Sequence, residues 1–192
     1  MALYSRAVVF MSFISSLMFI LAASETHPFS RSLSAHKPWV PAKHREKLTH
    51  LHFYFHDIIS GRNTTAVRVA GAPASAKSPT AFGTVFVTDD PLTLGPDLGS
   101  RLVGRAQGMY GSASLAELGL VMVMNFVFLE GKYKDSSLSL LGRNNVLSEV
   151  REMPIVGGSG MFRFARGYAQ VRTHMITAEQ ATVEYNVFVY HY

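Results

Sequence analysis

Two residues of opposite charge lie inside otherwise apolar segments and could do chemistry together. Asp57 shares one strand face with Phe53 and Phe55, where a carboxylate costs free energy unless it is paired or solvated. Burial at such a position would raise the pKa of Asp57 and make it a general acid or base. Arg151 carries a permanent charge and a planar set of donors, which could bind a phenolic oxygen or neutralise Asp57. The alternative is an Asp–Arg pair with a purely structural role.

Three histidines on the other face of the same segment raise the question of a metal site: His50, His52 and His56. Neighbouring positions on one face suit two imidazole ligands, but His56 lies further along and neither a cysteine nor a carboxylate is placed nearby. We therefore expect solvent-facing histidines, no metal and no cofactor. Gly157–Gly160 lacks the Lys-Ser/Thr pair of a phosphate-binding loop, so this segment predicts a turn.

The elements that must position these residues are strands. From Leu48 onward the chain consists of short β-branched and aromatic runs, and the first of them alternates between two unlike faces over 48–59. The other expected strands are 65–69, 82–88, 101–110, 118–128, 138–141, 146–155, 162–174 and 181–190. Turn-like separators include Ser60–Asn63, Asp89–Pro91 and Gly157–Gly160. About eight or nine strands at this spacing predict an all-β sandwich or barrel.

The expected strand 101–110 is informative about the interior, because the residues of one face are mostly small. That face carries Leu102, Gly104, Ala106, Gly108 and Tyr110. A packed core is normally filled by large side chains, so a small-residue face could leave room for a ligand, with Tyr110 at one end. Close approach of two backbones, or a bend of a barrel, explains glycine in a strand equally well.

The N-terminal residues predict a targeting segment rather than a part of the fold. Arg6 is followed by an apolar run over 7–22 and by small residues, which is the order of a secretory signal peptide cut at about Ser24. A membrane anchor is the alternative, but serines interrupt the run, and a span needs about 20 apolar residues. Residues 25–47 hold three prolines and no apolar period, so we expect a flexible leader before a single domain over 48–192. The apolar stretch 118–129 is too short to cross a membrane and is expected as a buried strand.

Secretion would bear on three other features of the sequence: a glycosylation sequon, the net charge and the lack of cysteine. Asn63-Thr64-Thr65 is a glycosylation sequon in a turn-like setting. The net charge of +5 suits an acidic cell wall, although ordinary surface charge explains it as well, and the basic residues are too scattered for a nucleic-acid site. The chain has no cysteine, so a closed sheet, an oligomer or both must supply the stability that disulfides give most small secreted domains.

Several segments together resemble the dirigent family of secreted plant proteins, and the resemblance extends from Leu48 to Tyr192. The segments are Phe55–Ile58, Asp89–Leu92, Val103–Tyr110, Val156–Gly160 and Phe164–Ala169. The resemblance implies an eight-stranded antiparallel β-barrel of the dirigent and allene oxide cyclase type. It also implies a homo-oligomer, for which a trimer is expected and a dimer is the alternative. The implied localisation is the apoplast or cell wall.

The resemblance further implies a pocket. The family's pocket aspartate, tyrosine and arginine fall on Asp57, Tyr110 and Arg151, and Phe55 would belong to the apolar wall. Lignan-forming members have a second aspartate where this chain has Asn144. With this departure, the segments 142–144 and 151–154 look more like the branch that includes pterocarpan synthases.

Three functions follow as hypotheses. The first is a guide without an oxidative centre: an external laccase or peroxidase makes phenoxy radicals of a monolignol such as coniferyl alcohol, and the protein orients them so that one lignan stereoisomer forms. The second is a hydro-lyase like pterocarpan synthase, with Asp57 as the general acid that dehydrates an isoflavanol through a quinone methide. The third is a wall-associated structural protein that binds no small molecule.

Overall fold

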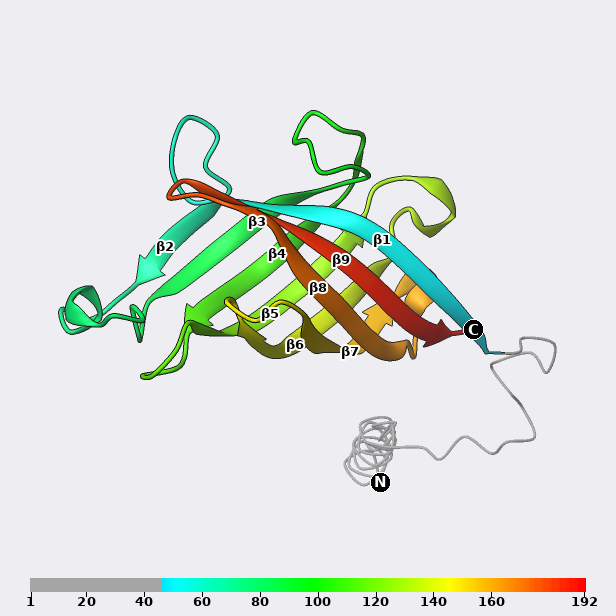
Figure 1. Ribbon diagram of the computed structural model, residues 1–192. Helices are drawn as coiled ribbons and strands as arrows, with labels where there is room; N and C mark the ends of the chain where they lie inside the picture. The colour runs from blue at the N-terminus through cyan, green and yellow to red at the C-terminus, as the bar shows by residue number, and fades with distance from the viewer. Residues whose placement is uncertain (1–45) are drawn as a thin grey trace, which may run out of the picture. The chain divides into compact units, whose positions relative to one another are not determined.

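Nine β-strands and three short 3-10 helices make up the part of the chain that the computed structural model describes, residues 46–192 (Figure 1). The signal peptide expected at 1–24, and the leader up to residue 45, lie outside these residues. Lys47 begins the first strand, so the last residue assigned to the leader belongs to the sheet. In chain order the elements are β1 (Lys47–Ile58), β2 (Ala66–Ala70), η1 (Ser75–Lys77), β3 (Val85–Thr93), β4 (Leu102–Ser112), β5 (Gly119–Phe128), η2 (Gly131–Tyr133), β6 (Ser137–Asn145), β7 (Arg151–Ser159), η3 (Gly160–Phe162), β8 (Arg166–Ile176) and β9 (Gln180–His191).

The strands form one antiparallel sheet that closes on itself. The order is β1-β9-β8-β7-β6-β5-β4-β3, and a short pairing between β1 and β3 closes the ring. This confirms the eight-stranded antiparallel barrel. Closure leaves few backbone groups of the sheet without a partner, which suits a chain that has no disulfide. No helix among residues 46–192 has the length and apolarity that a bilayer crossing requires.

The ninth strand, β2, continues the line of β1 along β3. Phe55 of β1 pairs with Leu92, and Ala66 of β2 pairs with Thr88, so the two strands share one edge of β3. Between them the chain leaves the sheet as a loop and returns at Thr65. The Thr65 N–H donates to the Ile58 carbonyl at 2.8 Å, and its carbonyl accepts from the Asp89 N–H at 3.0 Å. Thr65 therefore fills the seam at the point where β1 leaves β3.

Two expected turns are strand residues instead. Asp89–Pro91 lies within β3, where proline is tolerated because its missing N–H falls on the side where β3 changes partners from β2 to β1. Gly157–Ser159 lies within β7, and only Gly160 begins a helical turn. A Cβ on Gly158 would come within 2.6 Å of the Ser137 carbonyl oxygen, so close packing, not a turn, explains this glycine. Both turn predictions were wrong because turn propensity is a local signal that strand pairing can override.

The small-residue face of β4 does point into the barrel, but it does not make room for a ligand. A Cβ on Gly108 would lie 2.0 Å from the Val123 carbonyl oxygen, and one on Gly104 would lie 2.6 Å from that of Val127. These glycines allow the backbone of β5 to approach β4 closely. Packed aromatic rings fill the middle of the interior: Phe53 stacks on Tyr185 at 5.6 Å and meets Phe126 edge-on at 5.3 Å.

Candidate functional site

A cavity of about 230 Å³ lies at one end of the barrel. It is lined where β1, β4, β6 and β8 end and where β3, β5, β7 and β9 begin. The wall includes all five residues predicted for the site: Phe55, Asp57, Tyr110, Asn144 and Arg151. Strand alternation turns each of them inward, and closure of the sheet brings them together.

Asp57 and Tyr110 form the acidic side of the cavity. The Tyr110 hydroxyl donates to Asp57 Oδ2 at 2.9 Å, while Asp57 Oδ1 is buried without a partner among residues 46–192. Burial raises the pKa of Asp57 to about 6, and the hydrogen bond from Tyr110 opposes part of that rise. Burial and the nearby Asp57 carboxylate raise the pKa of Tyr110, so this phenol stays protonated. The pair can hold and deliver a proton at mildly acidic pH.

Arg151 occupies a different part of the wall. Its Nε donates to Asn144 Oδ1 at 3.1 Å, and its Nη1 donates to Thr173 Oγ1 at 2.8 Å and to the Ser148 carbonyl at 3.3 Å. Burial lowers its pKa, but a guanidinium stays charged at any physiological pH. Because Asn144 uses its oxygen to accept from Arg151, its amide nitrogen is left to donate to a ligand.

The proposed structural Asp57–Arg151 pair does not form. Tyr110 is the hydrogen-bond partner of Asp57, whereas Arg151 binds Asn144, Ser148 and Thr173. Neither charge is among the causes that shift the pKa of the other. An acid and a cation thus face one cavity from separate positions, and a ligand with two polar ends could contact both.

The space between the two polar groups is apolar and aromatic. Phe55 and Tyr185 lie 5.7 Å apart between ring centroids, and Phe86 stacks on Tyr110 at 5.1 Å. Aliphatic side chains complete the wall and the mouth: Ile59, Leu120, Met122, Val146, Ile176 and Val183. A hollow with ring walls and a few polar groups is typical of a site for a small aromatic molecule.

The comparisons with known proteins agree with this architecture. A family profile described as Dirigent-like protein matches residues 48–190. This chain belongs to the dirigent family. It is 54% identical to dirigent protein 21 of Arabidopsis thaliana over 177 residues, which cover 91% of this chain and 93% of that protein. It is 50% identical to pterocarpan synthase 1 of Glycyrrhiza echinata over 180 residues, covering 92% and 94% of the two chains.

Solved structures carry the same dirigent barrel. The pterocarpan synthase dirigent protein GePTS1 superposes with a TM-score of 0.74 at 51% identity, covering 78% of this chain and 87% of that one. For PsPTS1 the TM-score is 0.69 at 49% identity, with 76% and 96% covered. Relatives named as dirigent proteins and relatives named as pterocarpan synthases are thus similar to this chain at about the same level.

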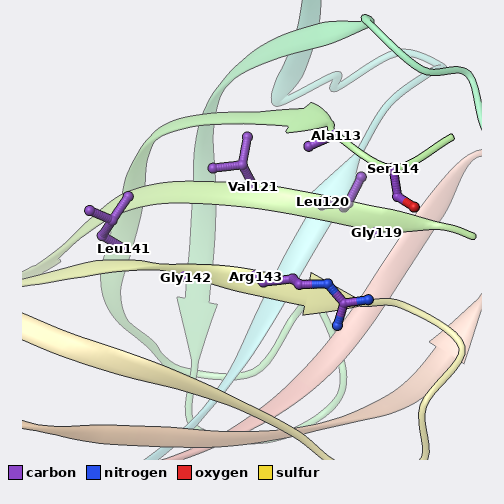
Figure 2. A pocket seen from close by; sticks show the side chains of 8 residues that line it. All are labelled: Ala113, Ser114, Gly119, Leu120, Val121, Leu141, Gly142 and Arg143. Atoms are coloured by element: carbon purple, nitrogen blue, oxygen red, sulfur yellow. The ribbon is translucent and has the colours of Figure 1, made fainter.

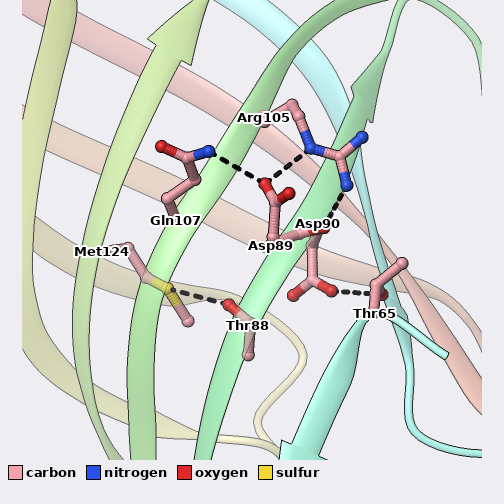
Figure 3. Close-up of polar contacts among 7 residues, drawn as sticks. All are labelled: Thr65, Thr88, Asp89, Asp90, Arg105, Gln107 and Met124. Atoms are coloured by element: carbon pink, nitrogen blue, oxygen red, sulfur yellow. Dashed lines mark hydrogen bonds and ion pairs between the residues drawn. The ribbon is translucent and has the colours of Figure 1, made fainter.

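The structure also places a second acid, which the sequence analysis missed, behind the cavity wall rather than on it. Asp90 is fully buried; its Oδ1 accepts from the Thr65 hydroxyl at 2.5 Å, and its Oδ2 has no partner within the described part of the chain (Figure 3). Burial raises its pKa to about 7, with the Asp57 charge as the second cause. The neighbouring Asp89 points outward instead and accepts hydrogen bonds from Arg105 and Gln107. Strand alternation would have revealed Asp90, had Asp89–Pro91 not been interpreted as a turn.

The histidines differ from one another. His50 and His52 are exposed and bond to β9 partners, Asn186 and Glu184, both at 2.8 Å. His56 is only 3% exposed, so the prediction of a solvent-facing position was wrong for this residue. Its Nε2 lies 2.6 Å from the hydroxyl of Thr93, the last residue of β3. No group of three potential His, Cys, Asp or Glu metal ligands occurs in residues 46–192.

Asn63 lies exposed in the loop between β1 and β2. The hydroxyl of Thr65, the third residue of the sequon, is engaged with Asp90. The Thr65 hydroxyl therefore has a structural role in the folded barrel that does not depend on the sequon. Glycosylation of Asn63 stays a prediction.

Proposed function

We propose that the cavity binds one phenolic molecule and that the protein acts on it as a hydro-lyase, removing water through a quinone methide. The observation that carries this proposal is a protonatable carboxyl, Asp57, half-buried in the wall of a mostly apolar cavity and hydrogen-bonded by Tyr110. The size of the cavity supports one occupant rather than two, because ligand pockets usually enclose roughly 300–1,000 Å³ and this one encloses about 230 Å³.

The proposed reaction balances with the groups at hand. Asp57 gives its proton to the leaving hydroxyl as the carbon–oxygen bond breaks, so that water departs. The substrate's phenolic proton then passes to Asp57, which restores the acid and leaves a quinone methide. A second hydroxyl of the substrate adds to the carbon that lost water, and its proton moves to the quinone methide oxygen. Arg151 and the Asn144 amide would hold a phenolic oxygen during these steps.

A second candidate is the guide for radical coupling that the sequence analysis placed first. The observation that favours it is the separate cation and amide site, Arg151 with Asn144, which could orient a phenoxy radical by its oxygen. In that case an external laccase or peroxidase supplies the radicals of a monolignol, and Asp57 relays a proton as the coupled quinone methide closes. Control of geometry alone would then decide which face couples.

Dependence on an oxidase separates the two candidates. The purified protein is incubated with racemic isoflavanols and with coniferyl alcohol, each with and without laccase, and products are resolved by chiral chromatography and mass spectrometry. If the protein is a hydro-lyase, a dehydrated product forms from an isoflavanol without laccase. An enantiomeric excess of coupled product that appears only with laccase would refute the lyase and support the guide for radical coupling. No product and no calorimetric binding in any arm would refute both and favour a wall-associated structural role.

We propose further that the barrel assembles with copies of itself, as a trimer, through its outer face. One row of directly paired, outward-facing residues crosses five strands: Val67, Val87, Met109, Val123 and Leu141, each between 41% and 57% exposed. Soluble monomers rarely expose contiguous apolar patches of this kind. At the β5–β6 end of the row is a mostly apolar groove of about 340 Å³, in which Val121 and Leu141 lie beside Arg143 (Figure 2).

The assembly is tested by sedimentation at micromolar concentration. Val123→Lys should shift the mass from three chains to one, because a charge at the centre of the row would be buried on assembly. Asn125→Lys, on the same strand and face but outside the apolar row, is the control that should keep the assembled mass. A wild-type mass of one chain would refute the assembly.

Secretion and glycosylation of this protein are also proposals. The signal peptide pattern at 1–24 supports secretion to the apoplast, and the sequon supports a glycan on Asn63. Protein recovered from apoplastic fluid should start near Glu25 and lose mass on treatment with an N-glycosidase. An intact N-terminus at Met1 would contradict cleavage.

A further inference from the structure

A half-buried acid, Asp57, and a fully buried acid, Asp90, belong to the two strands of the β1–β3 seam. Phe55 of β1 pairs with Leu92 of β3, and both side chains face the interior. Continuing that antiparallel register by two residues brings Asp57 opposite Asp90, again on the inner face. The charge of Asp57 is the second cause of the raised pKa of Asp90. The seam thus carries one acid that lines the cavity and one that lies fully buried.

Each of these carboxyls has one oxygen bound and one oxygen left over. Tyr110 donates to Asp57 Oδ2, and Thr65 donates to Asp90 Oδ1. Asp57 Oδ1 and Asp90 Oδ2 are buried and have no partner in hydrogen-bond geometry among residues 46–192, although the Thr88 hydroxyl also helps to lower the pKa of Asp90. An unpaired buried carboxylate oxygen is costly, and two neighbouring carboxyls resist losing both protons. One proton held by the pair would supply the missing donor and remove one of the two charges.

We propose that Asp57 and Asp90 share one proton, and that Asp90, held by Thr65, is a positioning residue that keeps this proton beside Asp57. The inference rests on the proposed role of Asp57 in the cavity. Below about pH 6, Asp57 carries a proton of its own in addition to the shared one. When Asp57 gives its own proton to the leaving hydroxyl, the shared proton stays on Asp90, whose O–H group faces and stabilises the new carboxylate. The phenolic proton of the substrate then restores Asp57, so the pair regains its initial proton count.

Other titratable groups act on the pair from several strands. Tyr110 and Tyr185 stay protonated because burial raises the pKa of both phenols. Arg105, on the outer face of β4, lowers the pKa of Asp90 but ranks last among its causes. Arg151 shares the cavity but does not figure among the causes acting on either acid. Among the charged groups, Asp57 therefore has the largest effect on the pKa of Asp90, whereas Asp90 is not among the causes that shift the pKa of Asp57.

Carbon NMR of the protein labelled at aspartate Cγ tests the pair directly and without substrate. The chain has only five aspartates, so single Asp→Asn variants assign each resonance. Wild type should show two steps, with Asp57 near pH 6 and Asp90 near pH 7. Asp57→Asn should lower the titration of Asp90 by about one to two pH units, the effect of one charge within about 7 Å at an effective dielectric near 20. Asp89→Asn is the matched control, because Asp89 faces outward, and should leave both steps unchanged.

Activity supplies a second readout that a merely structural role would not move. Asp90→Asn puts a fixed amide donor beside Asp57, so the pH above which turnover falls should drop by about one unit. If Asp90→Asn does not fold, Thr65→Val replaces it: Asp90 loses its donor, stays neutral to higher pH, and Asp57 should again titrate lower. The same Asp90 titration in wild type and Asp57→Asn would overturn the inference. If the NMR shift occurs but no variant or wild type turns over substrate, the pair stands and the proposed function fails.

Discussion

Replacing Asp90 by asparagine should change how the stability of the barrel depends on pH. The pKa of Asp90 rises from 3.8 to about 7 on folding, so the folded protein binds this proton more tightly than the unfolded chain. Its contribution to stability is therefore fully present below pH 3.8 and is lost as the pH rises through about 7. At 1.36 kcal/mol for each pKa unit, the loss amounts to about 4 kcal/mol.

Asparagine keeps the shape of the side chain and has no proton to lose. The free energy of unfolding of Asp90→Asn, minus that of wild type, should thus rise by up to about 4 kcal/mol between pH 4 and pH 8. Guanidinium unfolding followed by tyrosine fluorescence and circular dichroism at half-unit pH intervals measures both values. Subtracting wild type cancels His56, whose lowered pKa acts alike in both proteins.

Asp89→Asn is the control for this measurement as well. The pKa of Asp89 is lowered, chiefly because hydrogen bonds from Arg105 and Gln107 outweigh its partial burial, so its effect has the opposite sign. It should also be small, because exposed ion pairs contribute little. A difference between Asp90→Asn and wild type that stays constant from pH 4 to pH 8 would refute the argument, since Asp90 would then titrate alike in the folded and unfolded states.

Three further predictions concern single side chains of the site. Asp57→Asn should abolish turnover while calorimetry still detects phenolic ligand at near wild-type affinity; an unchanged rate removes Asp57 from the mechanism. Arg151→Met should weaken that binding about tenfold to a hundredfold, for loss of a charged hydrogen bond worth roughly 1.5–3 kcal/mol, and unaltered affinity means that the phenolic oxygen lies elsewhere. Thr65→Val should lower the free energy of unfolding by about 1–3 kcal/mol, because it leaves Asp90 without its donor; Asn63→Gln, which removes only the glycosylation acceptor, should leave unglycosylated protein as stable as wild type.

Local alternation explains why much of the barrel and its site could be predicted. In a strand, side chains at odd and even positions point to opposite faces. Phe55, Asp57 and Tyr110 could therefore be assigned to the interior before any pairing was known. The resemblance of the motifs then supplied the number of strands, and it supplied Asn144 as a pocket residue.

The failures have a common origin in non-local pairing. Asp89–Pro91 looks like a turn from its composition, but pairing with β4 holds it in a strand and turns Asp90 inward. His56 lies on the outward face by parity, yet Thr93 and Thr182 bond to it and it is buried. The glycines of β4 suggested an open space, whereas the backbone of β5 occupies it. In each case a residue's neighbours come from a distant segment, which periodicity does not identify.

The sequence by itself determined that this chain forms strands, which side chains those strands turn inward, and that a lone acid and a guanidinium would be among them, because period-two alternation is a local property. Only the tertiary structure decided that the two lie apart on one cavity wall, and that a second acid, Asp90, is buried where the Asp57 charge raises its pKa. Those outcomes depend on the register and closure of the sheet, which join residues far apart in the chain through hydrogen bonds that no local pattern specifies.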